Sequence, residues 1–151
     1  MDLLAELVAL VKQFDTDGVQ YAVCGGIALA IHGVPRATQD IDLLAEEASL
    51  PKLRLAAQQC GFTFEAEPMD FTQSGITIVR FTKLIGVQPL MLDVLFAKGP
   101  TGRVWEGRQE VVFEGTKIKV VSREGLITLK LAAARPQDLV DVQRLHEVDR
   151  G

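Results

Sequence analysis

Two aspartates that alternate with apolar residues constrain this chain more than any other feature. They lie in the segment Asp40-Ile41-Asp42-Leu43. Side chains alternate between the two faces of a strand, so both carboxylates are expected on one face, with Ile41 and Leu43 directed into the core. Two like charges on one strand face are unfavourable unless a cation lies between them. Asp40 and Asp42 therefore predict a metal site.

A glycine pair precedes the aspartates. Gly25 and Gly26 separate an apolar segment at 19–24 from a helical pattern at 26–31. Glycine lets a phosphate approach backbone N–H groups at the start of a helix, where the helix dipole is positive. Taken alone, the pair is also consistent with a tight turn from strand to helix. Together with the aspartates, it predicts a metal ion beside a bound triphosphate.

A third carboxylate, Asp93, lies alone within the apolar segment 90–96. An ionised side chain is rarely left without a partner in such a strand, and an arginine at the strand end is the alternative partner to a metal. Two-metal phosphoryl transfer needs carboxylates that converge from neighbouring strands, with metals ~3.5–4 Å apart. Beside Asp40 and Asp42, the metal is the favoured interpretation of Asp93.

Hydrophobic periodicity predicts a mixed α+β domain over residues 1–151. Helices are expected at 2–14, 26–31, 49–60, 126–134 and 139–148, with Asp2, Ser49 and Ser122 as caps, and strands at 19–24, 40–44, 62–65, 77–81, 90–96, 111–114 and 117–120. The last two strands form a hairpin around Gly115-Thr116. Because strands and helices do not alternate regularly, we expect a mixed β-sheet flanked by helices, with two C-terminal helices.

Composition narrows the classes of function. The net charge is −4, so any contact with nucleic acid has to come from a local patch. The amino end carries acidic residues where a signal peptide needs cations, and no apolar run approaches the ~20 residues that span a bilayer. Cys24 and Cys60 lack metal-ligand spacing. We expect a cytoplasmic protein with no membrane contact.

The glycine pair, the Asp-x-Asp strand and the later carboxylate strand resemble the nucleotidyltransferase superfamily that includes DNA polymerase beta. Gly-Gly-x-Ala-x-x-x-His-Gly at 25–33, followed by Arg-x-Thr-x-Asp-Ile-Asp-Leu at 36–43, is most similar to the AbiEii-like branch of abortive-infection toxins. The lysine helix and Arg-x-x-Asp-x-x-Asp at 130–141 resemble the closing motif of that branch. The resemblance implies a nucleotidyltransferase-like fold.

The resemblance also implies a role for each motif residue. The catalytic residues, which would also hold two Mg²⁺ ions, are Asp40, Asp42 and Asp93. The nucleotide-binding residues are Gly25, Gly26, Arg36, Thr38, Lys130 and Asp138. Lys130 would contact the triphosphate, with Asp138 orienting it, and its alternative is a solvated helix lysine. A simple position on the loop surface explains Arg36 equally well. Thr38 is also explained as a residue that fixes the conformation of the loop.

The implied reaction is Mg²⁺-dependent transfer of a nucleoside monophosphate from an NTP to a hydroxyl of tRNA or protein, with release of pyrophosphate. The resemblance suggests a toxin–antitoxin pair, so a cognate antitoxin or toxin is an expected partner. One alternative is a nucleotide-binding or regulatory module without turnover, which the three intact carboxylates disfavour. Another is an antitoxin that nucleotidylates its partner toxin.

Overall fold

The computed structural model describes the backbone of residues 1–150 and the side chains of residues 1–148. The helices are α1 (Leu3–Asp17), α2 (Gly25–Ile31), α3 (Leu50–Gln59), α4 (Arg123–Ala133) and α5 (Pro136–Arg150), with short 3-10 helices at Glu47–Ser49 and Gly99–Val104. The strands are β1 (Ala22–Cys24), β2 (Ile41–Ala45), β3 (Phe64–Glu65), β4 (Met69–Phe71), β5 (Ile76–Ile85), β6 (Gln88–Ala97), β7 (Gln109–Phe113) and β8 (Thr116–Val120).

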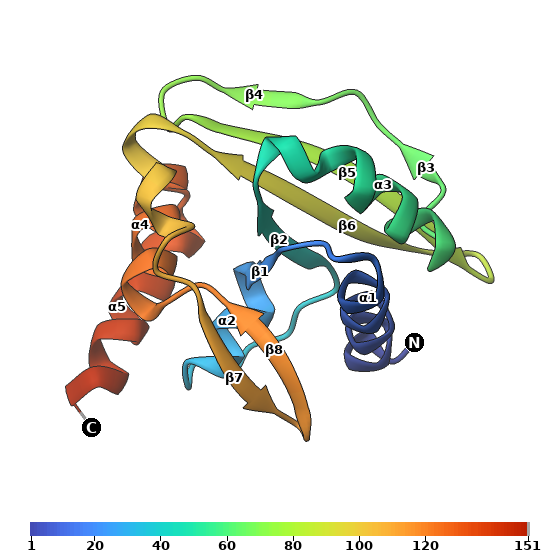
Figure 1. Ribbon diagram of the computed structural model, residues 1–151. Helices are drawn as coiled ribbons and strands as arrows, with labels where there is room; N and C mark the ends of the chain where they lie inside the picture. The colour runs from blue at the N-terminus through green and yellow to red at the C-terminus, as the bar shows by residue number, and fades with distance from the viewer. Residues whose placement is uncertain (151) are drawn as a thin grey trace.

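All strands belong to one mixed sheet. Its order is β3-β5-β6-β2-β1-β8-β7, and β4 pairs with β5 beside β3. The pairs β2/β6 and β1/β8 are parallel, and the other pairs are antiparallel. Figure 1 shows α1 and α3 together on one side of the molecule, and α2, α4 and α5 on the other. This architecture confirms the predicted mixed sheet flanked by helices, with two helices at the C-terminus.

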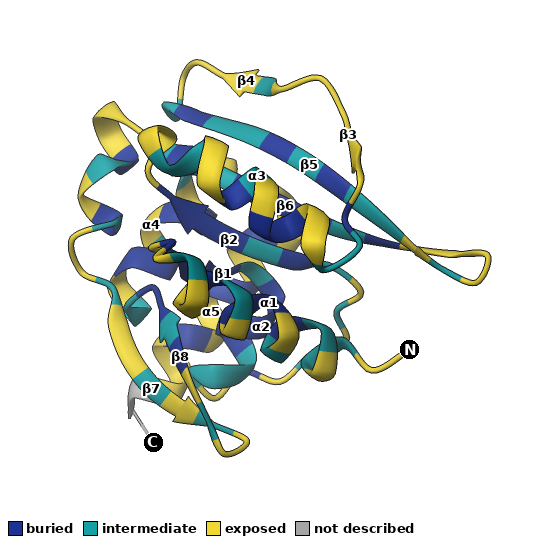
Figure 2. Ribbon diagram, turned by 45° about the vertical axis from the view of Figure 1, so that its right-hand side comes forward, coloured by how far each residue is buried: buried dark blue, intermediate teal, exposed yellow. Residues whose placement is uncertain are grey.

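The core is continuous through the central strands, which are almost entirely buried (Figure 2). On β2, Ile41 and Leu43 are fully buried, as their alternation with the aspartates predicts. Leu92 and Val94 on β6 are equally buried, on either side of Asp93. Each such side chain contributes about 1.5–3 kcal/mol through burial. The strand pair that carries the carboxylates is therefore held rigidly.

Two of the three predicted helix caps form. The Asp2 carboxylate accepts a hydrogen bond from the N–H of Ala5 (3.1 Å), and the Ser122 hydroxyl caps α4 in the same way. The prediction for Ser49 was wrong, because its side chain makes no capping hydrogen bond. The 3-10 helix at Glu47–Ser49 leads directly into α3, so the backbone at Ser49 is already helical.

Several element boundaries differ from the sequence prediction. Helix α2 begins at Gly25, and β2 begins at Ile41, so Asp40 lies immediately before the strand. Strand β4 and the 3-10 helix at Gly99–Val104 were not predicted, because three and six residues are too few to establish a period. Within residues 1–150, no helix is long and apolar enough to cross a membrane.

The turn between α4 and α5 contains a strained residue that offers a test of the fold. Ala134 ends α4 in the left-handed conformation, with φ of +52°. Glycine adopts this conformation without strain, so Ala134→Gly should raise the free energy of unfolding by about 1 kcal/mol. Urea denaturation followed by circular dichroism measures the change. Ala133→Gly, one residue earlier inside α4, should instead destabilise by about 0.5–1 kcal/mol, and equal effects at both positions would contradict the assignment.

Candidate active site

The three predicted carboxylates gather around the N-terminal half of β2. Asp42 on β2 and Asp93 on β6 are direct neighbours in register across the parallel pair. Asp40 precedes β2 by one residue and is partly buried, as is Asp42. The structure therefore brings together two aspartates that are separated by one residue and a third that follows about fifty residues later.

The proximity of these carboxylates alters their protonation. Burial, then the charges of Asp93 and Asp40, raise the pKa of Asp42 to about 7, although the cations Lys130 and Arg135 lower it. Burial and then Asp93 also raise the pKa of Asp40, against a lowering by Arg80. The repulsion is therefore incompletely neutralised by the protein's own cations, which is the condition that favours binding of a divalent cation.

Asp93 pairs with an arginine, which the sequence analysis gave as the alternative partner to a metal, and that arginine is Arg80. Nε of Arg80 donates to Oδ1 of Asp93 (2.7 Å), and Nη2 donates to Oδ2 (2.9 Å). The two residues are opposite each other in the antiparallel pair of β5 and β6. The bidentate geometry orients the Asp93 carboxylate. Arg80 lies within a predicted strand, but only the register of the hairpin places it opposite Asp93.

The glycine pair is required by close packing. Gly25 has φ of +66°, and a Cβ atom at this position would lie 2.1 Å from Oδ2 of Asp42. A Cβ atom on Gly26 would lie 2.7 Å from Oγ1 of Thr38. Thr38 also donates from its hydroxyl to the backbone carbonyl of Asp40 (3.4 Å), so it fixes the loop that leads into β2. The glycines thus let α2 start directly against the aspartate strand.

A buried network of charges joins α4, α5 and this loop. Nζ of Lys130 lies 3.2 Å from Oδ1 of Asp138 and 3.1 Å from Oδ2 of Asp141. Arg36 from the loop pairs with Asp141, and Arg135 pairs with Asp138 through Nε (2.7 Å). Charges alternate along the whole network, so each carboxylate is shared by two cations.

The pKa values of both aspartates in this network are lowered, which favours their ionised forms. Burial alone would raise the pKa of Asp138, but hydrogen bonds from Arg135 and Lys130 outweigh it and lower the pKa. For Asp141, burial is likewise outweighed by hydrogen bonds from Gln137, Lys130 and Arg36. Asp141 was expected only one helical turn beyond Asp138, and the structure makes it the link between the Asp40 loop and α5.

Three other residues have structural roles. His32 ends α2, and its Nε2 lies 2.8 Å from the carbonyl oxygen of Val121. Cys24 is buried in register with Asp42, and burial followed by that charge raises the pKa of its thiol. Trp105 is half-buried, and the guanidinium of Arg108 stacks 4.0 Å from its ring centroid.

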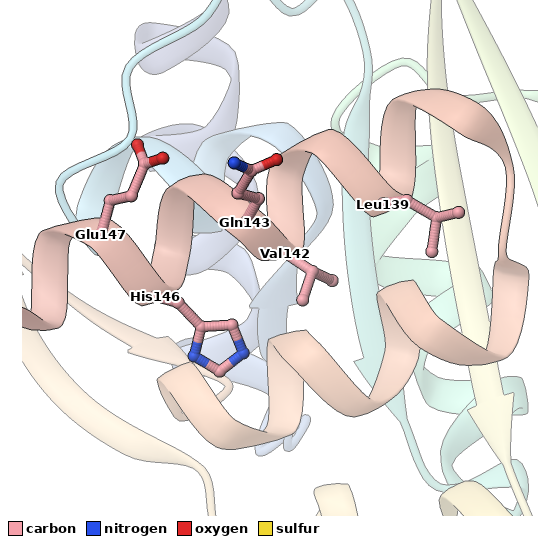
Figure 3. Close-up of a pocket in the computed structure, with 5 residues that line it drawn as sticks. All are labelled: Leu139, Val142, Gln143, His146 and Glu147. Atoms are coloured by element: carbon pink, nitrogen blue, oxygen red, sulfur yellow. The ribbon is translucent and has the colours of Figure 1, made fainter.

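A cavity of about 460 Å³ lies on α5 and is not lined by the three carboxylates. Its described lining residues all belong to that helix (Figure 3): Leu139, Val142, Gln143, His146 and Glu147. A second cavity of about 300 Å³ lies at the C-terminal ends of β2 and β6, beside Trp105. Among the described residues, no three His, Cys, Asp or Glu side chains are grouped closely enough to hold a metal ion by themselves.

The sequence matches a known family over residues 7–151. That family is described as the nucleotidyl transferase AbiEii toxin of type IV toxin–antitoxin systems. The chain belongs to the AbiEii nucleotidyltransferase family. It is therefore a nucleotidyltransferase, as its motifs predicted. Among proteins of curated function, none matches the sequence.

Solved structures share the fold of this AbiEii-family chain. TM1012 of Thermotoga maritima, named as a nucleotidyltransferase, superimposes with a TM-score of 0.65 at 17% identity, covering 95% of this chain and 92% of that one. ANT(2″)-Ia, solved in complex with adenylyl-2″-tobramycin, gives 0.63 at 18% identity, covering 96% and 87%. JHP933 from Helicobacter pylori gives 0.53 at 18%, covering 95% and 64%. Identities this low show a common fold alone.

Because Gly25 is crowded by Asp42, the addition of one methyl group at this position should lower the free energy of unfolding strongly. Gly25→Ala should cost about 1 kcal/mol of backbone strain, and about 2 kcal/mol more because its Cβ displaces Asp42. Gly18→Ala is the matched control, since Gly18 has a similar φ of +70° and open space around it. Urea denaturation of both variants measures the difference. Equal losses of stability would show that Asp42 is not held against Gly25.

The raised pKa of Asp42 predicts a pH dependence of stability without divalent cations. An aspartate in the unfolded chain titrates near pH ~4, whereas Asp42 in the folded protein has a pKa of about 7. The folded state binds more protons between these values, so the stabilisation is present at low pH and is lost as the pH rises through 7. Asp42→Asn removes it.

The measurement is thermal unfolding in EDTA across that pH range. Relative to Asp42→Asn, the wild type should lose several degrees of Tm as the pH rises through the window between the two pKa values. Asp15→Asn, an exposed aspartate near the end of α1, should follow the wild type. Parallel curves for the wild type and Asp42→Asn would contradict the shifted pKa.

Proposed function

We propose that this chain transfers a nucleoside monophosphate from an NTP to a hydroxyl of tRNA or protein, with Mg²⁺ held by Asp40, Asp42 and Asp93, and that it acts with a cognate antitoxin. The observation that carries the proposal is the register of Asp42 with Asp93, with Asp40 beside them. The AbiEii family supplies the reaction class and the toxin–antitoxin setting.

The charge balance of the site supports a requirement for divalent cations. Five carboxylates and four cations interact within it: Asp40, Asp42, Asp93, Asp138 and Asp141 with Arg36, Arg80, Lys130 and Arg135. A site with this excess of negative charge repels a triphosphate. Oxygen-rich carboxylates are the ligands that Mg²⁺ prefers, so the donor set fits the ion.

Each residue then has a physical task. Asp40, Asp42 and Asp93 would hold the metal ions, which would supply charge neutralisation and make an attacking hydroxyl more acidic. Asp93 is oriented by Arg80 and keeps a lone pair on each oxygen, so it can accept the proton of the acceptor hydroxyl. Gly25 leaves the space that Asp42 needs. Thr38 and Arg36 fix the loop before Asp40.

A labelling experiment tests this function. The protein is incubated with Mg²⁺, each α-³²P-labelled NTP, total tRNA and cell extract, and the labelled acceptor is identified by gel electrophoresis and nuclease or protease digestion. Asp40→Asn and Asp42→Asn should each lower transfer at least about 100-fold, because several kcal/mol of charge stabilisation are lost. EDTA should abolish it.

Asp15→Asn controls for general effects of removing a carboxylate and should transfer label like the wild type. Label on tRNA identifies a tRNA acceptor, and label on a protein encoded beside this one identifies an antitoxin role in which the partner toxin is nucleotidylated. NTP binding without transfer to any acceptor would overturn the proposed reaction.

A further inference from the structure

The network around Lys130 contains a second cation that is better placed to meet a ligand. The side chain of Lys130 is only 9% exposed, and its ammonium contacts two carboxylates, Asp138 and Asp141, which are 1% and 0% exposed. A buried lysine between two buried carboxylates compensates their charge, and its removal would leave Asp138 with Arg135 alone and Asp141 with Arg36 alone. Lys130 therefore acts as an internal link between α4 and α5.

Arg135, unlike Lys130, is largely exposed to solvent. Its side chain is 74% exposed, although Nε and Nη2 bind Asp138 at 2.7 and 3.2 Å. A guanidinium has five N–H donors, so the two bonds to Asp138 leave the Nη1 group available. Within the described part of the chain, its side chain makes no hydrogen bond or ion pair other than those to Asp138. Arg135 is thus charged, oriented and open to solvent at the same time.

The orientation of Arg135 is fixed from both sides of the turn. Its backbone N–H also donates to Oδ2 of Asp138 (3.1 Å). The preceding residue, Ala134, is held in the left-handed conformation, and Pro136 begins α5 with a restricted φ. A non-glycine residue with positive φ marks a backbone that the surrounding structure imposes. The turn therefore presents the arginine in one direction.

A chain of ion pairs leads from Arg135 to the loop before the carboxylates. Asp138 binds Arg135 and Lys130, Lys130 also binds Asp141, and Asp141 binds Arg36 of the loop that leads to Asp40. Along the network, three cations (Arg36, Lys130 and Arg135) share two carboxylates. One positive charge is left over, and it lies at the exposed end of the network, on Arg135.

We propose that Arg135, held by Asp138, binds the triphosphate of the nucleotide directly, and that Lys130 is a positioning residue behind it. The inference rests on the proposed function and revises the role expected for Lys130. Arginine suits this task because its planar guanidinium binds phosphate oxygens in pairs. Two of its donors hold Asp138 while the Nη1 side meets the phosphate.

Binding and stability measured on the same variants test the proposal. Pyrophosphate, and each of the four NTPs, are titrated with Mg²⁺ into wild type and Arg135→Gln by calorimetry, and thermal unfolding is recorded for both. Arg135→Gln should weaken pyrophosphate and NTP binding at least tenfold, while Asp138 keeps Lys130 as a partner and Tm falls by less than in Lys130→Met. Arg135→Lys should recover part of the affinity. Nucleoside monophosphates should bind both proteins equally.

Two further variants separate binding from structure. Arg144→Gln makes the same change at an exposed position on α5 and should alter neither property. Lys130→Met should lower Tm by more than Arg135→Gln, since it leaves two buried carboxylates without their shared cation. Wild-type affinity for pyrophosphate in Arg135→Gln would overturn the inference while leaving the proposed function intact. A wild type that binds no NTP with Mg²⁺ would overturn both.

Discussion

The structure depends on one electrostatic constraint: Asp42 and Asp93 are in register on adjacent parallel strands, with Asp40 next to them. Fully buried neighbours such as Ile41 and Leu92 hold these strands in place, so the carboxylates do not separate to relieve their repulsion. Around them, the fold places a glycine that allows close approach and arginines and a lysine that partly neutralise the charge.

The two carboxylates in register are not equivalent. Asp93 has its own counterion, because Arg80 is opposite it across β5 and β6 and binds both of its oxygens. Among the described residues, Asp42 has no such ion-pair partner. Burial, and then the charges of Asp93 and Asp40, raise its pKa to about 7, and the charges of Lys130 and Arg135 offset this only in part. The orientation of Asp93 is thus fixed by Arg80, whereas the charged form of Asp42 would be stabilised most by a bound cation from outside the chain.

The sequence predicted the parts of the site that are encoded locally. Asp40 and Asp42 alternate with core residues, Asp93 interrupts an apolar strand, and Gly25 begins a helix, so each is signalled within a few positions. Arg80 was missed because its role depends on the register of the hairpin formed by β5 and β6, whose strands have ten residues each. The fold follows the same rule: long periodic elements were predicted, while the three-residue strand β4 was not.

The closing motif could be predicted only in part. Asp138 was expected to orient Lys130, and the two residues do pair, but only the turn at Ala134, which folds α5 back onto α4, brings Asp141 against Lys130 as well. The same turn leaves Arg135 exposed. Because Arg36 pairs with Asp141, α5 is joined directly to the loop that ends at Asp40. The C-terminal helices are therefore linked to the candidate active site by this ion pair, as well as through the charges of Lys130 and Arg135 that act on Asp42.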